Sequence, residues 1–402
     1  MSGDQTRLNE LRKQVLGWNK VHPVGTKVRT PLYPGRVLET SSAATVLFGR
    51  KPVVHLAGFS GYFDLETVTP VETAGHEEQR TVIMFPGQGT QRRGMGAELF
   101  TSFPDETRRA SEILGYSIEQ LCVDDPQGRL DQTRYAQVAL YVVNALGYMQ
   151  HQRQSGQPRC KADILMGHSL GEYNALLAAG VFDFESGLRL VMQRAELTAA
   201  APLGAMAVVL GIDALRVREI LRRNALTGVD LANYNTPTQS SISGTPELID
   251  RAMAALGAEG ITVLRLRVSG AFHSRYMSQA RESFAAYVRT VPFSRPVRPV
   301  IANATARPYD PKRIAETLIM QLTSPVLWMD SVQYVLQDGP AEFIEIGGSI
   351  LGPMVREITA LHGTPIRAIE AHAAPVRSDS PLHRSQTASS KATAISDTER
   401  HP

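Results

Sequence analysis

A serine flanked by glycines is the first feature of this sequence whose spacing could do chemistry. Residues 167–171 read Gly-His-Ser-Leu-Gly and fit the Gly-x-Ser-x-Gly turn that joins a strand to a helix. In that turn a Cβ at either glycine would collide with neighbouring backbone, and the serine hydroxyl lies beside the free amides of a helix N-terminus. Such amides can stabilise an oxyanion. The motif predicts Ser169 as a nucleophile, although a serine between glycines is often only a turn.

A serine hydroxyl is a poor nucleophile unless a base lies within hydrogen-bond reach. Of the ten histidines, His168 belongs to the turn itself, so its side chain should point away from that of Ser169. His273 is the better candidate because it follows a predicted strand and so lies in a loop at a strand end, where catalytic residues of α/β folds gather. The alternative is a histidine with a structural role inside that loop.

The segments around this turn predict an α/β fold in which strands alternate with helices. A buried strand over 164–166 precedes the turn and a helix over 170–179 follows it. Arg194 interrupts the apolar stripe of a second helix, so its side chain either extends to solvent or turns inwards towards a carboxylate. Further strands are predicted over 81–85, 297–302 and 342–346, and further helices over 105–114, 136–150, 184–200 and 312–322.

Residues 205–268 predict a second, smaller subdomain inserted in the first. The pattern gives strands over 205–210, 228–232, 240–243 and 261–268, with helices over 214–223 and 246–256. A strand-helix-strand-strand-helix-strand order is that of the ferredoxin-like split βαβ unit. The predicted fold class is therefore an α/β domain with a parallel sheet and a ferredoxin-like insert.

Both ends of the chain differ from this domain in residue composition and in hydrophobic pattern. Residues 1–75 predict a small module, with a helix over 4–18 whose Leu8, Leu11, Val15 and Leu16 share a face. Short β-rich runs follow over 27–29, 36–38, 44–48, 53–56 and 62–69, which is the spacing of a small antiparallel sheet or barrel. We expect the main domain to cover residues 80–372 and a Ser/Thr/Ala/Pro-rich, disordered tail to cover 373–402.

Composition excludes several classes of function. With 20% charged residues and a net charge of +3 over 402 residues, the chain lacks the basic patch of a nucleic-acid-binding protein. The glycine-rich turn over 86–91 lacks the Lys-Ser/Thr of a phosphate-binding loop. Cys122 and Cys160 form no CxxC, so neither a disulfide framework nor a metal site is indicated. No signal peptide or membrane-spanning apolar run is evident, and we expect a cytoplasmic protein.

Several motifs together resemble one family. They are residues 85–91 (Phe-Pro-Gly-Gln-Gly-Thr-Gln), 94–96 (Gly-Met-Gly), 167–173 (Gly-His-Ser-Leu-Gly-Glu-Tyr), 192–194 (Met-Gln-Arg), 204–207 (Gly-Ala-Met-Ala), 232–235 (Ala-Asn-Tyr-Asn), 271–274 (Ala-Phe-His-Ser), 321–326 (Gln-Leu-Thr-Ser-Pro-Val) and 343–347 (Phe-Ile-Glu-Ile-Gly). Their order and spacing resemble malonyl-CoA:acyl carrier protein transacylases from about residue 81 to about residue 370. The run over 270–277 is most similar to the discrete acyltransferases that serve polyketide synthases in trans.

The resemblance implies a role for each matching residue. Ser169 would be the acyl-accepting nucleophile and His273 its general base and acid. The backbone amides of Gln88 and Leu170 would form the oxyanion hole, and Arg194 would hold the malonyl carboxylate bidentately. A main-chain carbonyl, here that of Gln321, would orient the histidine in place of an aspartate. The acyl pocket would be lined by Gln137, Asn235 and Phe272.

The implied reaction is ping-pong transfer from malonyl-CoA to the phosphopantetheine thiol of an acyl carrier protein. No cofactor or metal is expected beyond the phosphopantetheine of the partner, and we expect a monomer. Phe272 favours malonyl over methylmalonyl, although a single methyl group is worth only about 1 to 3 kcal/mol of discrimination. The sequence departs from the family pattern over 347–349, where a proline is more usual, and throughout 1–75.

Two other functions remain open at this point. An acyl hydrolase that clears stalled carrier proteins would share the fold, although it would have no carboxylate for Arg194 to bind. A catalytically idle docking protein would use the N-terminal module to bind a synthase, and the joint presence of Ser169, His273 and Arg194 disfavours it.

Overall fold

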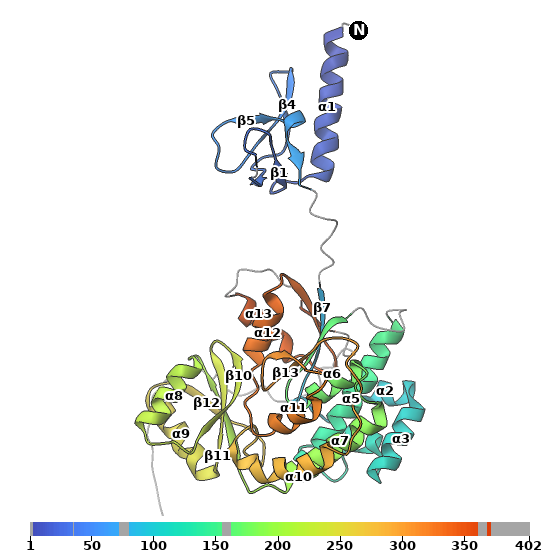
Figure 1. Cartoon of the computed structure of the whole chain (residues 1–402), viewed down its shortest axis with the longest axis vertical. Helices are drawn as coiled ribbons and strands as arrows, with labels where there is room; N and C mark the ends of the chain where they lie inside the picture. Colours follow the sequence, from blue (N-terminus) through green and yellow to red (C-terminus); the bar gives the residue numbers. More distant parts are fainter. Residues whose placement is uncertain (1–2, 35, 72–79, 155–161, 361–367, 371–402) are drawn as a thin grey trace, which may run out of the picture. The chain divides into compact units, whose positions relative to one another are not determined.

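The computed structural model divides into two compact units, one within residues 1–79 and one within residues 80–402 (Figure 1). It describes residues 3–34, 36–71, 80–154, 162–360 and 368–370. The predicted tail over 373–402 lies outside these ranges.

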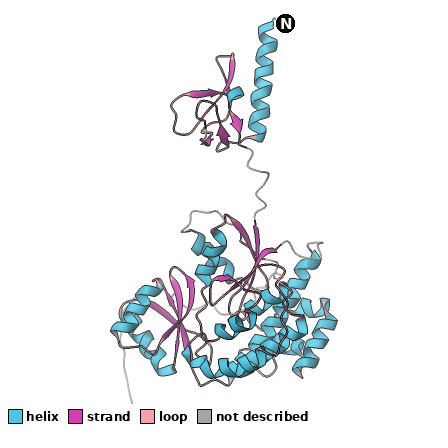
Figure 2. Cartoon of the chain, viewed as in Figure 1, coloured by secondary structure: helices cyan, strands magenta, loops and turns pink. Residues whose placement is uncertain are grey.

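A six-stranded sheet forms the centre of the larger unit, in the order β14-β13-β8-β7-β15-β16 (Figure 2). Its neighbouring strands run parallel except for the edge hairpin of β13 and β14. The predicted parallel sheet is confirmed. The strands are β7 (Arg80–Phe85), β8 (Ala162–Gly167), β13 (Val300–Ala302), β14 (Arg307–Pro308), β15 (Ala341–Glu345) and β16 (Ala368–Glu370).

Helices cover both faces of this sheet, which is why its central strands β7, β8 and β13 are mostly apolar. On β7, Ile83 and Phe85 belong to one core cluster, whereas Val82 and Met84 belong to another on the opposite face. The first face packs mainly against α5 (Thr133–Gln154), α6 (Gly171–Ala178), α7 (Phe184–Ala199), α10 (Ser278–Val288) and α11 (Ile314–Gln321). The second face packs against α12 (Trp328–Leu336) and α13 (Leu351–Ala360).

Three shorter helices lie between β7 and α5 in the chain. They are α2 (Ala97–Ser102), α3 (Pro104–Leu114) and α4 (Ile118–Val123). Their buried side chains, among them Phe100, Ala110 and Ile118, belong to the core cluster of the first face. They therefore extend the packing around α5 and α7.

The inserted subdomain has the predicted ferredoxin-like topology. Its strands lie in the order β10-β11-β9-β12 and all neighbours are antiparallel. The elements are β9 (Ala205–Leu210), α8 (Ala214–Arg223), β10 (Asp230–Thr236), β11 (Gln239–Gly244), α9 (Pro246–Ala258) and β12 (Thr262–Arg265). The strand predicted over 228–232 lies further along the chain, because the polar Asn233 and Asn235 are buried and continue the strand.

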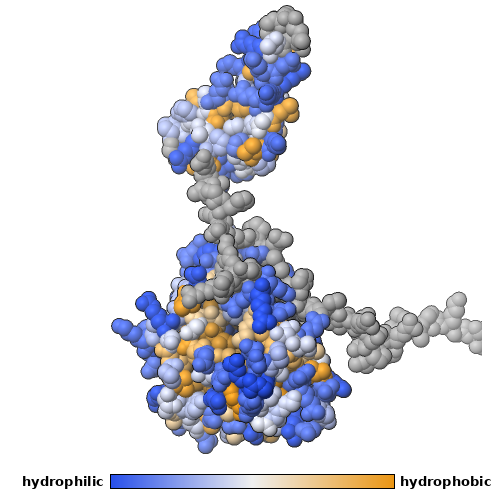
Figure 3. Space-filling view, turned by 90° about the vertical axis from the view of Figure 1, so that its right-hand side faces the viewer, coloured by the Kyte–Doolittle hydropathy of each residue, from blue (hydrophilic) through white to orange (hydrophobic). Residues whose placement is uncertain are grey.

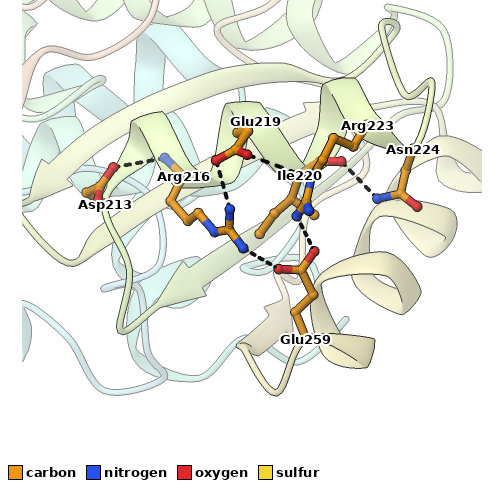
Figure 4. Close-up of polar contacts among 7 residues, drawn as sticks. All are labelled: Asp213, Arg216, Glu219, Ile220, Arg223, Asn224 and Glu259. Carbon is orange, nitrogen blue, oxygen red and sulfur yellow. Dashed lines mark hydrogen bonds and ion pairs between the residues drawn. The ribbon is translucent and has the colours of Figure 1, made fainter.

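A network of ion pairs ties the two helices of this insert together (Figure 4). Arg216 donates to Glu219 and to Glu259, each over 2.8 Å, and Arg223 donates to Glu259 over 2.6 Å. These side chains are between 31% and 47% exposed, so solvent screens the pairs and each contributes little to stability. The Asp213 carboxylate caps α8 by accepting from the Arg216 amide.

In its described residues, the smaller unit has one α-helix and two antiparallel sheets of three strands, β2-β1-β6 and β3-β4-β5. Its elements are α1 (Gly3–Val21), β1 (Lys27–Arg29), β2 (Leu38–Glu39), β3 (Thr45–Leu47), β4 (Lys51–His55), β5 (Tyr62–Asp64), the 3-10 turn Leu65–Thr67 and β6 (Thr69–Pro70). Together they bury a small core of their own.

Two expectations for this unit are wrong. The run over 62–69 is not one strand, because the Asp64 side chain caps the turn at Glu66 and separates two strands that join different sheets. Leu16 does not share the packed face of α1, since it is 70% exposed while Val15 is buried. Figure 3 shows apolar residues among polar ones on the surface of this unit.

Candidate active site

The serine turn joins β8 to α6 and holds Ser169 in the left-handed region, with φ of +52°. A Cβ on Gly167 would lie 2.0 Å from the carbonyl carbon of Gly171, and one on Gly171 would lie 2.0 Å from the Phe85 oxygen. Both positions therefore require glycine, as the motif predicts. The amide of Ser169 donates to Oδ1 of Asn303 over 2.6 Å, which helps to offset the backbone strain.

The structure brings His273 against the nucleophile, with 2.7 Å between its Nε2 atom and Oγ of Ser169. Its Nδ1 atom lies 3.1 Å from the carbonyl oxygen of Gln321 and 3.2 Å from that of Ser324. Carbonyl oxygens only accept, so Nδ1 carries the hydrogen and Nε2 presents its lone pair to the serine hydroxyl. The geometry is that of a serine–histidine dyad oriented by main-chain carbonyls.

Burial sets the protonation state of this base. His273 is 4% exposed, and its desolvation, with a further contribution from the charge of Arg194, lowers the pKa of the imidazole to about 3. The ring is therefore neutral at physiological pH and is free to accept a proton. Like Ser169, His273 has a positive φ, of +55°, so both reacting side chains are held by strained backbone.

Arg194 turns inwards from α7 and is 4% exposed. Its Nη1 atom donates to Oε1 of Gln137, and its Nη2 atom lies 3.3 Å from Oε1 of Gln321 and 3.4 Å from Oγ of Ser169. Within the described part of the chain, its Nε atom has no hydrogen-bond partner and no carboxylate forms an ion pair with it. Burial lowers the pKa of Arg194, but a guanidinium stays protonated.

The hydrogen bonds of this buried cation go only to neutral groups, and the Glu172 carboxylate acts on it at longer range, across Gln321. A buried cation without a directly bonded anion is costly, which favours an anionic ligand. One terminal nitrogen of the guanidinium lies 3.4 Å from Oγ of Ser169, and its Cζ atom lies 5.5 Å from the centre of the Tyr173 ring. The site is thus suited to a small acyl group that carries its own carboxylate.

The predicted oxyanion donors lie on two loops that touch. A Cβ on Gly87 would come within 2.5 Å of the His168 oxygen and 3.5 Å of the Leu170 nitrogen, so only glycine allows this approach. Neither the amide of Gln88 nor that of Leu170 donates to any acceptor in the ranges that the structure covers. Both are available to a tetrahedral intermediate.

The three residues predicted to line the acyl pocket differ in how they contact the other residues of the site. Gln137 is wholly buried and bonds both Arg194 and Oγ1 of Thr198. Oδ1 of Asn235 lies 3.0 Å from Nε2 of His168, which is its one hydrogen bond to the serine turn in the described residues. Phe272 is half-buried next to His273 and packs against the core cluster of the first sheet face.

Sequence reasoning missed four residues of the site. The Asn303 side chain accepts from the Ser169 amide, and the Ser324 carbonyl accepts from Nδ1 of His273. The other two are Tyr309 and Glu172, whose hydroxyl and carboxylate form a hydrogen bond close to the serine turn. One signal was available: Asn303 directly follows a short buried strand, at the edge where polar residues of α/β sheets meet.

A cavity of about 710 Å³ opens at His273, between the insert and the larger subdomain. Its lining includes three arginines, Arg218, Arg222 and Arg275. Arg275 is paired with Asp230, and Arg218 donates to the hydroxyl of Tyr234 over 2.7 Å. In the described ranges, no set of three or more ligating side chains is arranged for a metal ion. No helix there is both long and apolar enough to cross a bilayer.

Comparison with known proteins gives one family model and several related sequences. Residues 82–351 match the acyl transferase domain. The chain is 45% identical over 278 residues to the polyketide biosynthesis malonyl CoA-acyl carrier protein transacylases BaeC of Bacillus velezensis and PksC of Bacillus subtilis, covering 68% of this chain and 95% and 96% of theirs. It is 47% identical to the polyketide biosynthesis protein ThaF of Burkholderia thailandensis, of which it spans only 24%.

Solved structures give the same result. The malonyl CoA-acyl carrier protein transacylase of Burkholderia pseudomallei superposes with a TM-score of 0.68 and 45% identity, over 71% of this chain and 99% of that one. A type II polyketide malonyl-transacylase in complex with its acyl-carrier protein, PlMCAT:AntF, superposes with a TM-score of 0.67 and 31% identity, over 72% of this chain and 95% of that one.

Proposed function

This chain belongs to the acyl transferase family, and from that premise we propose that it moves a malonyl group from malonyl-CoA to an acyl carrier protein in polyketide biosynthesis. One observation carries the proposal: a buried Arg194 without a carboxylate partner in the described part of the chain lies 3.4 Å from the Oγ atom of Ser169. A nucleophile beside an unpaired buried cation favours an acyl group that ends in a carboxylate.

In the first half-reaction, Nε2 of His273 takes the proton of Ser169 as Oγ attacks the thioester carbonyl carbon. The negative charge that develops on the carbonyl oxygen is stabilised by the amides of Gln88 and Leu170. The carbon–sulfur bond then breaks, and His273 returns the proton to the CoA thiolate. The enzyme is left with a malonyl ester on Ser169.

The malonyl carboxylate binds the guanidinium of Arg194 during this step. Gln137 and Gln321 each accept from one of its terminal nitrogens, which fixes the plane of the donor fork. A planar fork binds a carboxylate through two parallel hydrogen bonds, whereas an acetyl group offers it nothing. The charge pair lies away from water and is correspondingly strong.

In the second half-reaction, the thiol of the carrier's phosphopantetheine gives its proton to His273 and attacks the ester carbon. Ser169 leaves and recovers a proton from His273, so no net proton is gained or lost by the enzyme. The products are the malonyl carrier and free CoA. Because the His273 ring is neutral at the start of each half-reaction, the same nitrogen serves both.

The cavity beside His273 supports the choice of donor and acceptor. Both CoA and a phosphopantetheine arm are long, flexible and anionic, and Arg218 and Arg222 line the approach to the dyad. Cations at this mouth would attract the phosphate of either. The relative PlMCAT, whose structure contains its acyl-carrier protein, makes such a carrier the expected partner.

The test is incubation of the purified protein with malonyl-CoA and a phosphopantetheinylated acyl carrier protein, followed by mass analysis of the carrier. We expect a malonyl carrier that does not form with Ser169→Ala or with a carrier lacking phosphopantetheine. Release of malonate without loading of any carrier would contradict the proposal and favour an acyl hydrolase. Equal loading from methylmalonyl-CoA would extend the donor class.

A further inference from the structure

A second carboxylate-centred network lies directly beneath the nucleophile. Glu172, in the first turn of α6, has no exposed surface. Oε1 accepts from the hydroxyl of Tyr309, and Oε2 accepts from Nε2 of Gln321 over 2.6 Å and from the amide of Asn303 over 3.2 Å. Nothing in the transfer chemistry uses this group, although it lies three residues from Ser169.

One arm of this network runs through Gln321. With Nε2 held by Glu172, the amide must present Oε1 to Arg194, 3.3 Å from Nη2. The same Nε2 atom donates to the carbonyl oxygen of Ser169 over 3.0 Å, and the main-chain carbonyl of Gln321 orients His273. Glu172 thus determines which way the Gln321 amide faces. A flipped amide would turn two N–H donors towards the Arg194 cation.

The other arm runs through Asn303. Glu172 fixes the main chain of Asn303, whose side chain accepts from the amide of Ser169 over 2.6 Å and donates to the carbonyl of Gly167 over 2.6 Å. These two contacts clamp both sides of the strained turn. A residue with positive φ persists only where its surroundings hold it.

Hydrogen bonding explains why this position carries a carboxylate rather than an apolar residue. Burial raises the pKa of Glu172 to about 7, which makes its ionised form costly, and the hydrogen bonds from Tyr309, Gln321 and Asn303, followed by the charge of Arg194, offset part of that cost. An apolar side chain of the same size would avoid the desolvation penalty. It would also leave the Gln321 amide free to rotate and the Asn303 amide without its acceptor.

We propose that Glu172 is a positioning residue that holds the nucleophile, the base and the carboxylate-binding arginine in register through Gln321 and Asn303. Only the role of Arg194 in this inference rests on the proposed function. The claim about the Ser169–His273 dyad is independent of any acyl donor.

The test measures how fast a sulfonyl fluoride labels Ser169, because that reaction needs the dyad and no malonyl group. We expect Glu172→Gln to slow labelling by at least about tenfold, since a single amide oxygen replaces two carboxylate oxygens that accept from three donors. Gln321→Leu, which keeps the main-chain carbonyl, should slow it as well. Both substitutions remove the same hydrogen bond between Glu172 and Gln321. The loss of rate in the double variant should therefore be smaller than the product of the two single losses.

Glu345→Gln is the matched control. Glu345 is 1% exposed and accepts from the amides of Ile350, Leu351 and Gly352 at the start of α13. Its replacement should lower the melting temperature without slowing the labelling of folded protein. Should Glu172→Gln not fold, Gln321→Leu alone still decides the matter.

Labelling of folded Glu172→Gln or Gln321→Leu at the unaltered rate would overturn the proposal, as would losses that multiply in the double variant. If the unaltered protein is labelled by the sulfonyl fluoride but transfers no malonyl group, the proposed function is contradicted instead. The two claims therefore fail separately.

Discussion

The Nη2 atom of Arg194 lies 3.4 Å from Oγ of Ser169, so a single short acyl group can be esterified at one and ion-paired at the other. A malonyl group has its carboxylate two bonds beyond the ester carbonyl carbon, which suits so close a spacing. Gln137 and Gln321 hold the guanidinium from two sides, and no carboxylate in the described part of the chain forms an ion pair with it.

Replacing Arg194 with alanine should therefore invert the choice of acyl donor. We expect kcat/KM for malonyl-CoA to fall by about two to three orders of magnitude, because a buried charge pair is lost, and that for acetyl-CoA to fall much less. Self-acylation rates with the two thioesters measure the ratio. Arg189→Ala, on the exposed side of the same helix, is the control and should leave the ratio as it is.

Phe272 should restrict the width of the acyl pocket. Its half-buried ring lies beside His273, and Phe272→Ser would leave space for a branch on the acyl chain. We expect acylation by methylmalonyl-CoA to rise relative to malonyl-CoA by about 10- to 100-fold, the value of one methyl group. Competition between the two thioesters, read by the mass of the acyl-enzyme, measures it. A ratio that does not move would remove Phe272 from the pocket.

The turn around Ser169 should tolerate no side chain at Gly171. A Cβ there would lie 2.0 Å from the main-chain oxygen of Phe85, so Gly171→Ala should cost about 3 kcal/mol or more of folding stability and abolish acylation. Urea unfolding compares it with Gly257→Ala, in the last turn of α9, where nothing lies within 4 Å. That control should be neutral or stabilising by up to about 1 kcal/mol. Equal stabilities would refute the steric account.

Two buried groups of the site give opposite pH dependences of stability. The folded pKa of Glu172, about 7, exceeds its ordinary 4.5, so its contribution is complete below that value and is lost as the pH rises through 7. The folded pKa of His273, about 3, lies below its ordinary 6.5, so its contribution is present above 6.5 and is lost as the pH falls through 3.

The Glu172 effect can be isolated by substitution. Between about pH 5 and about pH 8, the free energy of unfolding of the native chain should fall relative to that of Glu172→Gln, by on the order of 1–3 kcal/mol. Urea titrations of both proteins at each pH measure the difference, in which the other titrating groups cancel. A difference that is constant with pH would contradict the raised pKa of the buried carboxylate.

Local patterns predicted much of this molecule. The turn over 167–171 is specified by its own glycines, and the order of elements in the insert follows from hydrophobic periodicity alone. That reasoning left the direction of the Arg194 side chain undecided, because an arginine on an apolar stripe can point to solvent or inwards. Its inward direction depends on Gln137 and Gln321, which approach from other helices.

The support beneath the nucleophile was beyond sequence reasoning. Glu172 contacts Asn303, Tyr309 and Gln321, between 131 and 149 residues away in the chain, and no local pattern encodes such partners. The strand boundary at residues 62–69 has a local cause instead, because the Asp64 side chain caps the turn at Glu66 and outweighs β propensity. At the site itself, tertiary contacts decide what periodicity leaves open.

The most direct measurement is the intact mass of the protein after brief exposure to malonyl-CoA. The account predicts an increase by one malonyl group, located by peptide mapping at Ser169, absent from Ser169→Ala and strongly slowed in His273→Ala. The adduct should disappear when a phosphopantetheinylated carrier is added. A malonyl adduct on another residue, or none on a folded protein, would contradict the account.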